Sequence, residues 1–504
     1  MTEPFVPALA FATQGVSVAI AVGVVLILAA MSWVPHLPNS LWLDETLSFW
    51  VVKDGLAESI DRGVHYQSQP AYYVFLWFWT RLAGTSEIAL RIPSLFAALV
   101  ACAALAKLGT SLTNDRETGL LASVVFASTW NVYREAVDAR SYMLGVVVLL
   151  GLALCLLRWL DHGRWRDAWL IGVLAAMLPH LHVFFTFTYP AFAVYAALRW
   201  PGTRGSAKQI ALVGSFLLIG ALLFLPVAST LVAHAGSYSF VPPPTWSALF
   251  GVFVWGPVVA GLLAGICVAG VLGSGPEGRS DSLVSSSRSV SREGALLLAI
   301  WMFLPLLLLF GISMWTEASI FLGRYLIPAV PAICLFYGIA LRGIASAPVR
   351  VVAVVVIALA SLSIHERPRD DFRAAALAVN EFVASDTSVP ILFASGLIEG
   401  QDETWLRNPD LAEYLNAPTA YYPLDGRVVA LPRKLHGQPL SNEIVEPVLR
   451  EAGRFATIEW FGNGARVLPW LIQRAQGAGY RVENRAFGGV RVAFFRFEGG
   501  PRRK

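Results

Sequence analysis

The sequence predicts an α-helical polytopic membrane protein with about 11 transmembrane helices, followed by a smaller α/β domain. Of its 504 residues, 56% are apolar and only 14% are charged, whereas soluble domains average about 25% charged residues. The apolar residues also gather in long segments, and these segments stop near residue 365. Composition and segment length together therefore indicate an integral membrane protein with a C-terminal domain of different character.

Apolar segments of spanning length recur along the first part of the chain, where a membrane helix needs about 20 such residues. The candidate spans are 11–33, 91–110, 117–132, 141–160, 166–180, 182–199, 209–233, 252–272, 294–314, 325–341 and 348–364. We expect an outer hairpin at Pro179 to His182, and one long kinked helix over 166–199 is the alternative. The first segment lacks the basic start of a signal peptide and is long enough to span, so we expect an uncleaved helix.

Positive charges are concentrated in the loops on one side of the predicted bundle. That side carries Lys107, Arg116, Arg158, Arg164, Arg166, Arg199, Arg204, Lys208, Arg279, Arg288, Arg292, Arg342 and Arg350. The opposite short loops carry Arg134, Arg140 and Arg324. Because Lys and Arg accumulate in cytoplasmic loops, we expect a cytoplasmic N-terminus and an extracytoplasmic C-terminal tail. The Ser-rich and Gly-rich stretch 273–293 is then a flexible cytoplasmic linker.

Two regions depart from a simple bundle. The first outer loop, about 35–90, contains a run over 69–79 rich in Tyr and Trp, which is typical of helices lying at the membrane surface. Beyond residue 365, helix-like segments alternate with strand-like ones. We expect helices over 372–383 and 465–476, and strands over 389–393, 427–430, 456–460 and 490–495. This alternation predicts a transmembrane domain over 1–364 and an extracytoplasmic α/β domain over 365–504.

The charge balance and the cysteines exclude several classes of protein. The formal net charge is +4 without a basic run, so we expect no nucleic-acid partner. The four cysteines, Cys102, Cys155, Cys267 and Cys334, lie in apolar segments without Cys-x-x-Cys spacing. We therefore expect buried thiols, and neither a disulfide framework nor a zinc site.

Polar residues collect at the predicted outer ends of the helices. They are Asp44 and Glu45 in the first loop; Arg134, Glu135, Asp138, Arg140 and Tyr142 before the fourth span; and His180, His182, His234, Tyr238, Glu317, Arg324 and Tyr325 farther along. A carboxylate near hydrocarbon is costly unless it is paired or hydrated, so the adjacent Asp44 and Glu45 are the foremost candidates. The pattern predicts a site at the outer membrane surface rather than a path through the bilayer.

Each of these residues also has a structural interpretation. Asp44 could cap a helix, a role worth about 1 kcal/mol. Arg140 and Arg324 could extend to phospholipid headgroups. His180 and His182 flank a predicted turn and could be interfacial residues rather than metal ligands. No single residue decides between the two interpretations.

Five short motifs follow one another at the predicted outer surface. They are Asp44-Glu45, Gln69-Pro70-Ala71-Tyr72-Tyr73, Ala89-Leu90-Arg91-Ile92-Pro93-Ser94, Asp138-Ala139-Arg140-Ser141-Tyr142 and Gly323-Arg324-Tyr325-Leu326-Ile327-Pro328-Ala329. In this order they resemble the GT-C class of membrane glycosyltransferases, and within it the protein O-mannosyltransferases and the lipid A aminoarabinose transferases. The resemblance covers the transmembrane region, and the C-terminal domain is similar only in layout.

The resemblance implies a glycosyltransferase of the plasma (inner) membrane that moves a hexosyl or pentosyl group from a polyprenyl-phosphate donor on the outer face. Asp44 would be the catalytic base, with Glu45 in a supporting role. The residues expected to hold the donor phosphate and lipid are Arg140, Tyr142, Arg324 and Tyr325, and those expected to line the acceptor side are His65, Tyr66, Gln69, His180 and His182. No cofactor is required, no metal ligands are assigned, and a divalent cation is left open. The acceptor is a lipid, a glycan or a protein.

The chain departs from the aminoarabinose-transferase pattern at two positions. Those relatives have an acid just before the proline of the interfacial helix, where this chain has Ser68-Gln69-Pro70. They also have an aspartate near the start of the fourth span, where Arg140 and Ser141 stand here. The departures argue against that particular sugar as the substrate.

The chemistry of an outward-facing transfer supports the same assignment. Nucleotide sugars are charged and cytoplasmic, so the donor must already have crossed the membrane as a lipid. A base must take the proton of the acceptor hydroxyl, and arginines suit the departing phosphate because their planar fork matches its oxygens. The main alternative is a transporter or flippase, against which stand the missing inverted repeat and the scarcity of midplane charges. A scaffold that binds a lipid-linked sugar without transferring it is the second alternative.

Overall fold

The computed structural model describes residues 27–233, 242–273, 290–316, 319–344, 346–362, 370–384, 386–394, 396–433, 439–460 and 467–499. Contacts divide the chain into two compact units. The first unit comprises Met1–Leu37, Ile60–Leu76 and Arg91–Glu366. The second unit comprises Pro38–Ser59, Trp77–Leu90 and Arg367–Lys504. The second unit therefore contains two pieces of the first predicted loop in addition to the C-terminal residues.

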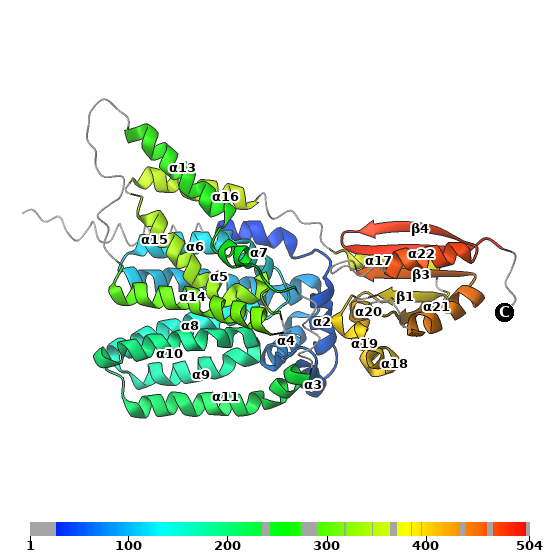
Figure 1. Ribbon diagram of the computed structural model, residues 1–504, viewed down its shortest axis with the longest axis horizontal. Coiled ribbons are helices and arrows are strands. Elements are labelled where there is room, and N and C mark those ends of the chain that lie inside the picture. Colours follow the sequence, from blue (N-terminus) through cyan, green and yellow to red (C-terminus); the bar gives the residue numbers. More distant parts are fainter. Residues whose placement is uncertain are drawn as a thin grey trace, which may run out of the picture. The chain divides into compact units, whose positions relative to one another are not determined.

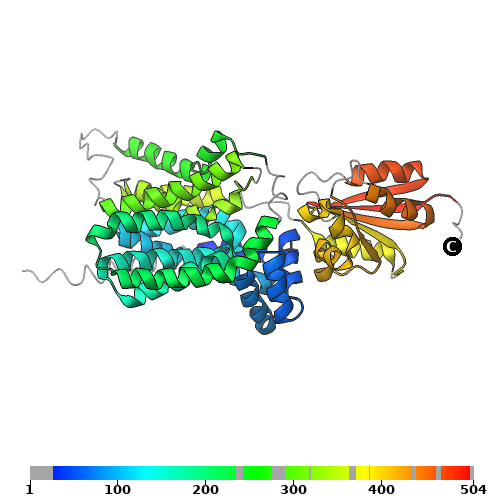
Figure 2. The ribbon, with the colours of Figure 1, turned by 60° about the horizontal axis from the view of Figure 1, so that its bottom comes forward.

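Helices build the first unit (Figure 1). They are α6 (Arg116–Ser128), α7 (Trp130–Ala136), α8 (Tyr142–His162), α9 (Trp165–Leu181), α10 (Tyr189–Arg199), α11 (Ala207–Ala233), α12 (Trp246–Gly251), α13 (Gly256–Gly273), α14 (Arg292–Trp315), α15 (Val330–Arg342) and α16 (Ala347–Leu362), with the 3-10 segments η2 (Val183–Thr188) and η5 (Gly323–Ala329). Helices α3 (Leu56–His65), α4 (Pro70–Ala83) and α5 (Glu87–Thr113) have residues in both units. Helices α8 to α11 run side by side (Figure 2).

Five helices among the described residues are long and apolar enough to cross a bilayer. They are Glu87–Thr113, Tyr142–His162, Ala207–Ala233, Arg292–Trp315 and Gly323–Arg342. Each coincides with a predicted span, which confirms the helical, apolar character of this region. Helices α13 and α16 also coincide with predicted spans but are shorter, and the total of eleven spans stays a prediction.

The predicted split of the stretch 166–199 is confirmed. Helix α9 ends at Leu181, and His182 has extended backbone (φ −167°, ψ 126°). The 3-10 segment η2 follows before α10 begins at Tyr189. A single kinked helix, the alternative reading, is therefore wrong.

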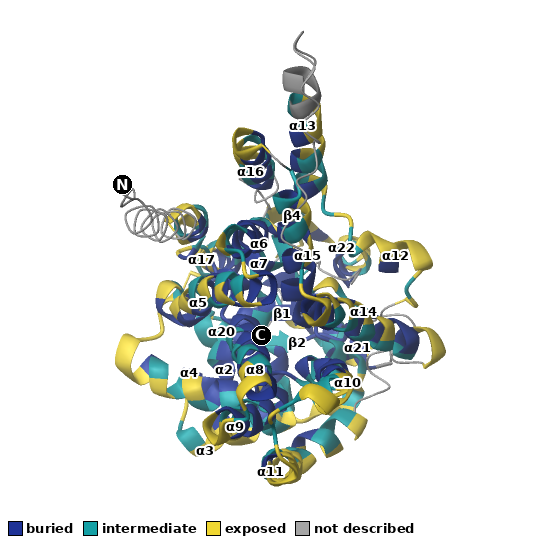
Figure 3. Cartoon of the chain, turned by 90° about the vertical axis from the view of Figure 1, so that its left-hand side faces the viewer, coloured by how far each residue is buried: buried dark blue, intermediate teal, exposed yellow. Residues whose placement is uncertain are grey.

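The surface of the first unit is apolar along helix α11. Only 11% of the spanning window of α11 is buried, whereas 72% of the window over Gly323–Arg342 is buried. Figure 3 shows the same contrast in colour, with yellow along α11 and dark blue along α6 and α8. Its exposed side chains include Leu218, Leu222 and Leu223. An apolar surface of this length is expected where lipid, rather than water, covers a protein.

Some sequence-based expectations fall outside the described residues. Most of the first predicted span, 11–33, lies there, as do most of the linker 273–293 and the candidates His234, Tyr238 and Glu317. All four cysteines are free thiols, and Cys102, Cys155 and Cys334 are buried as expected. The expectation of burial was wrong for Cys267, which is exposed on α13, a helix whose outer side chains other elements leave uncovered.

A five-stranded mixed sheet forms the centre of the second unit. Its strands are β1 (Pro390–Ala394), β2 (Arg427–Ala430), β3 (Arg454–Trp460), β4 (Tyr480–Phe487) and β5 (Val490–Phe497), in the order β2-β1-β3-β5-β4. Strand β1 runs parallel to β2 and β3, and β5 runs antiparallel to β3 and β4. The predicted α/β character is confirmed, while the strand β4 was not anticipated.

Helices cover both faces of this sheet. They are α17 (Phe372–Val383) on one face and α21 (Pro439–Glu451) and α22 (Val467–Gly477) on the other. Helices α18 (Glu403–Arg407), α19 (Pro409–Leu415) and α20 (Ala417–Tyr421) belong to the same unit, as does helix α2 (Leu43–Val52) of the first loop. Phe495 packs with residues of α21 and α22 in one core. The neighbouring Phe494 contacts Phe382 of α17, with 4.9 Å between ring centroids. Side chains that alternate along β5 thus contact helices on opposite faces.

The hairpin between β4 and β5 turns through two glycines. Gly488 has a positive φ of 61°, a conformation that costs residues with a Cβ atom about 1 to 2 kcal/mol. Two-residue hairpin loops require such a conformation because their twist must match that of the strands. The pairing of β4 with β5 therefore depends on glycine at position 488.

We expect Gly488→Ala to lower the melting temperature of the second unit in the purified full-length protein, because alanine is strained at positive φ. The expected loss is about 1 to 2 kcal/mol, measured by intrinsic tryptophan fluorescence on heating. Gly453→Ala is the matched control, since a Cβ atom there meets nothing within 4 Å. Equal melting temperatures for the two variants would contradict the conformational argument.

Candidate functional site

Asp44 and Glu45 lie in the first turn of helix α2, in the second unit. The helix begins at Leu43, and the carboxylate of Glu45 accepts a hydrogen bond from the backbone N–H of Trp42 at 3.2 Å. An acid at this position that bonds back to the residue before the helix is one half of a capping box. Glu45 is fully buried and Asp44 is half-buried. The N-cap interpretation of Asp44 is wrong, because the N-cap residue is Trp42 and Asp44 lies inside the helix.

A second carboxyl group lies near Asp44. Burial raises the pKa of Asp370, and the negative charge of Asp44 raises it further. The indole N–H of Trp460 donates to Asp370 at 2.7 Å, and hydrogen bonds from Trp460 and from the Gly489 backbone act in the opposite direction. An aspartic acid that retains its proton more readily than usual thus accompanies Asp44 within the second unit. Among the described residues, no group of three or more His, Cys, Asp or Glu side chains could hold a metal ion.

The other candidate residues belong to the first unit, where Arg140 lies in the link between α7 and α8. Its side chain is 7% exposed. One terminal nitrogen donates to the side-chain oxygen of Gln67 at 3.1 Å, and the hydroxyl of Ser94 donates to the Arg140 carbonyl at 3.0 Å. The guanidinium is therefore held from the residues before α4, and the backbone of Arg140 is held from α5. Such fixation reduces the conformational entropy that the side chain loses when it binds an anion.

Aromatic rings form a continuous group beside Arg140 and Arg324. The ring of His182 lies 4.6 Å from that of Tyr142 and 5.2 Å from that of Phe184, as measured between centroids. Phe184 stacks on Tyr325 at 4.0 Å. The Arg324 guanidinium lies 5.9 Å from the centre of the Tyr325 ring. Four of the predicted residues, Tyr142, His182, Arg324 and Tyr325, are thus brought together.

The pKa of His182 responds to the positive charge in this region. Burial, and then the charges of Arg140 and Arg324, lower the pKa of His182 to about 3. The imidazole is consequently neutral near pH 7, and its Nδ1 accepts from the backbone N–H of Phe184 at 3.4 Å. The charges of both arginines act on this imidazole, and Arg324 lies over the Tyr325 ring, whose centroid is 6.0 Å from that of His182. A phosphate would be favoured there because arginine recognises its oxygens through paired hydrogen bonds.

The remaining predicted residues have other surroundings. Gln69 is buried and accepts from the Ser141 hydroxyl at 2.8 Å, which links the start of α4 to the start of α8. His180 contacts α11, through the Gly220 carbonyl at 3.1 Å and the Phe224 ring. His65 is exposed and pairs with Asp61 at 3.0 Å, and the neighbouring Tyr66 is half-buried. The structure therefore separates His180 from His182, which the sequence placed in one hairpin.

Sequence reasoning missed three residues that the structure adds. Gln67 holds Arg140, Phe184 joins His182 to Tyr325, and Asp370 lies near Asp44. Gln67 is adjacent to the predicted Tyr66 and Phe184 is two residues from the predicted His182, so proximity in the chain was an available signal. Asp370 is more than three hundred residues from Asp44, and no local pattern marks it.

Residues 67–229 match the sequence model of the family described as dolichyl-phosphate-mannose-protein mannosyltransferase. This segment contains Gln69, Arg140, Tyr142, His180 and His182. No curated protein matches the chain significantly.

Solved structures are similar to the chain over nearly its whole length. ArnT from Cupriavidus metallidurans bound to undecaprenyl phosphate matches with a TM-score of 0.55 at 12% identity, covering 96% of this chain and 99% of ArnT. The apo state of the same protein matches with a TM-score of 0.54 at 12% identity, covering 96% and 98%. A variant of the arabinofuranosyltransferase AftD from Mycobacteria matches with a TM-score of 0.50 at 15% identity, covering 94% of this chain and 41% of AftD.

At identities this low, the structural similarity shows the fold and nothing more specific. The resemblance carried by the five motifs is thereby confirmed, and the chain has the fold of the membrane glycosyltransferases of the GT-C class that use polyprenyl-phosphate sugars.

Proposed function

We propose that the protein transfers a sugar from a polyprenyl-phosphate donor to a hydroxyl group of an acceptor on the outer face of the plasma membrane. The observation that carries this proposal is the group of the Tyr142, His182, Phe184 and Tyr325 rings, with the Arg324 guanidinium 5.9 Å from the centre of the Tyr325 ring. The charges of Arg140 and Arg324 both act on His182 of this group. Two arginines beside apolar rings suit a ligand that is both phosphorylated and lipidic. The similarity to a structure that holds undecaprenyl phosphate supports the same ligand class.

Asp44 acts as the base in this proposal. The acceptor oxygen forms a bond to the anomeric carbon while the bond from that carbon to the phosphate oxygen breaks. The electron pair leaves with the polyprenyl phosphate, and the proton of the acceptor hydroxyl passes to Asp44 and then to water. General base catalysis typically contributes about 10² to 10⁴-fold. Asp44 suits the role because its side chain is only half-buried, whereas Glu45 is fully buried and bonds to the Trp42 amide.

Arg140 and Arg324 stabilise the departing phosphate. Negative charge grows on the leaving oxygen as the glycosidic bond breaks, and fixed cations lower the energy of that transition state. Arg140 is held by Gln67 and so needs little rearrangement. Tyr142, Phe184 and Tyr325 supply apolar surface for the first isoprene units. Neutral His182 adds ring surface without adding a third positive charge.

The orientation of the protein follows from its charges. Basic residues at the cytoplasmic ends of the helices set an inward N-terminus, which leaves the second unit and Asp44 outside. A reaction on that side requires a donor that has already crossed the bilayer. The transferred group is a hexose or a pentose, and the donor that accumulates in a strain lacking the protein, identified by mass spectrometry of extracted polyprenyl phosphates, names the sugar.

We expect Asp44→Asn to reduce consumption of that accumulated donor by about 10² to 10⁴-fold, because the amide cannot accept the proton. The assay adds purified protein to membranes of the deletion strain, which supply both donor and acceptor. Glu58→Gln, an exposed acid on α3, is the control and should leave consumption unchanged. Full consumption by a folded Asp44→Asn protein would remove Asp44 from the mechanism.

We expect Arg324→Ala to weaken binding of undecaprenyl phosphate about tenfold, because one charge-assisted contact to phosphate is lost. Binding is measured by the shift in melting temperature as the lipid is titrated. Arg324→Lys should recover part of the loss, since it restores charge but not the planar fork. Arg116→Ala, at an exposed position on α6, tests for a general effect of charge. An unchanged affinity in Arg324→Ala would exclude the phosphate role.

A further inference from the structure

Helix α2 is held along its length by helices α19 and α20 of the second unit. The ring of Phe49 meets that of Tyr421 edge to face at 4.9 Å, and Trp50 meets Tyr414 at 5.4 Å. Beyond the C-terminal end of α2, the Lys53 ammonium pairs with Glu413 at 2.6 Å. These contacts fix the body of α2 but lie at least one turn away from Asp44.

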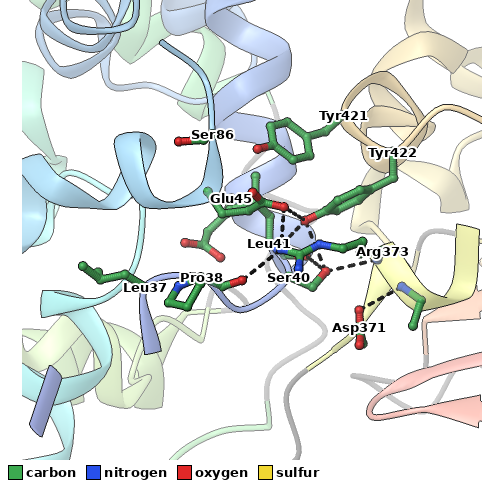
Figure 4. Close-up of polar contacts among 12 residues, drawn as sticks. Leu37, Pro38, Ser40, Leu41, Glu45, Ser86, Asp371, Arg373, Tyr421 and Tyr422 are labelled. Atoms are coloured by element: carbon green, nitrogen blue, oxygen red, sulfur yellow. Dashed lines mark hydrogen bonds and ion pairs between the residues drawn. The ribbon is translucent and has the colours of Figure 1, made fainter. Parts of the chain in front are cut away.

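The hydroxyl group of Tyr422 contacts the segment that enters α2 (Figure 4). It accepts the backbone N–H of Leu41 at 2.8 Å and lies 3.3 Å from the Ser40 hydroxyl. It donates to the carboxylate of Glu87, the first residue of α5, at 3.2 Å. A phenol has one proton and two acceptor sites, so these three contacts use the full capacity of the hydroxyl. Packing of the Tyr422 ring would not require any of them.

Arg373 completes the network from helix α17. Its backbone N–H donates to the Ser40 hydroxyl at 3.2 Å. Its guanidinium donates to the Pro38 carbonyl at 2.9 Å and to Glu87 at 2.6 Å. Tyr422 and Arg373 therefore contact the three residues Pro38, Ser40 and Leu41 of the segment that enters α2.

We propose that Tyr422 and Arg373 are positioning residues that hold Asp44 in its reactive place. Leu41 precedes Asp44 by three residues, so the bond from its amide to Tyr422 sets where the first turn of α2 begins. A general base works only within hydrogen-bond reach of its proton, and a displacement of about 1 Å can reduce a rate about 10²-fold. The inference rests on the proposed role of Asp44 and extends the working site to the C-terminal α/β residues.

The test compares Tyr422→Phe with Tyr421→Phe in the full-length protein. Both variants keep an aromatic ring on the same stretch of chain and lose one hydroxyl. The Tyr421 hydroxyl donates to the Thr85 carbonyl at 2.8 Å rather than to the segment before α2. Hydrogen exchange of the peptide covering 41–45 reports the position of the helix start, and consumption of the accumulated donor in deletion-strain membranes reports transfer.

In Tyr422→Phe we expect exchange at 41–45 to rise about tenfold, because the Leu41 amide loses its acceptor. Transfer should fall by about tenfold or more, with exchange in β1 and β3 unchanged. In Tyr421→Phe both readings should equal those of the wild type. Combining Tyr422→Phe with Asp44→Asn should cause no loss beyond that of Asp44→Asn alone, because the hydroxyl acts through Asp44. Arg373→Gln should reproduce the Tyr422→Phe pattern more weakly, and it replaces that variant if Tyr422→Phe does not fold.

Four results would overturn the inference. Exchange that rises throughout the sheet would show a general loss of stability. Exchange that stays at the wild-type level over 41–45 would show that the hydroxyl does not hold the helix start. Faster exchange over 41–45 in Tyr422→Phe without loss of transfer, while Asp44→Asn is inactive, would refute the positioning role and leave the proposed function intact. Full transfer by Asp44→Asn would refute the role of Asp44, and the positioning role would fall with it.

Discussion

Backbone amides that enter a helix must find acceptors, and the two amides just before α2 find them in side chains. Trp42 bonds to Glu45, and Leu41 bonds to Tyr422. An unsatisfied buried amide costs about 1 to 3 kcal/mol, so neither bond is dispensable for this conformation. Glu45 caps the helix and is fully buried, whereas the adjacent Asp44 is half-buried. In the proposed mechanism the two neighbouring acids therefore have different tasks.

In the first unit, ion pairs and the two candidate arginines lie at the ends and links of the helices. Asp115 and Glu117 at the start of α6 pair with Arg342 and Arg350 of α15 and α16. Arg140 and Arg324 lie in the links before α8 and α15. Between these positions the helices are apolar, and α11 exposes leucines over much of its length. Charged groups avoid hydrocarbon because their transfer is costly, so a phosphate site can form only where links such as these come together.

Periodicity and hydropathy predicted the features that local sequence determines, namely the bounds of helices and strands. The helix over 372–383 and the strand over 427–430 have the predicted bounds, and the break at His182 lies where a hairpin was expected. Arg140, Tyr142, His182, Arg324 and Tyr325 were chosen by their position at helix ends, and the structure brings them together. The sequence did not reveal Asp370, Arg373 and Tyr422 as candidates, because their contacts with the segment around Asp44 join residues more than three hundred positions apart. Exposed strand β4 was missed because its outward residues are polar and resemble a loop.

The bond between Leu41 and Tyr422 joins residues 381 positions apart. At synthesis rates of about 5 to 20 residues per second, helix α2 must wait about 20 to 80 seconds for its partner to leave the ribosome. During that interval the segment carrying Asp44 has no Tyr422 or Arg373 to hold it. A chain that ends prematurely, even after all of its apolar segments are in the membrane, consequently never acquires the ordered segment. The residues around Tyr422 thus determine when the segment that carries Asp44 becomes ordered.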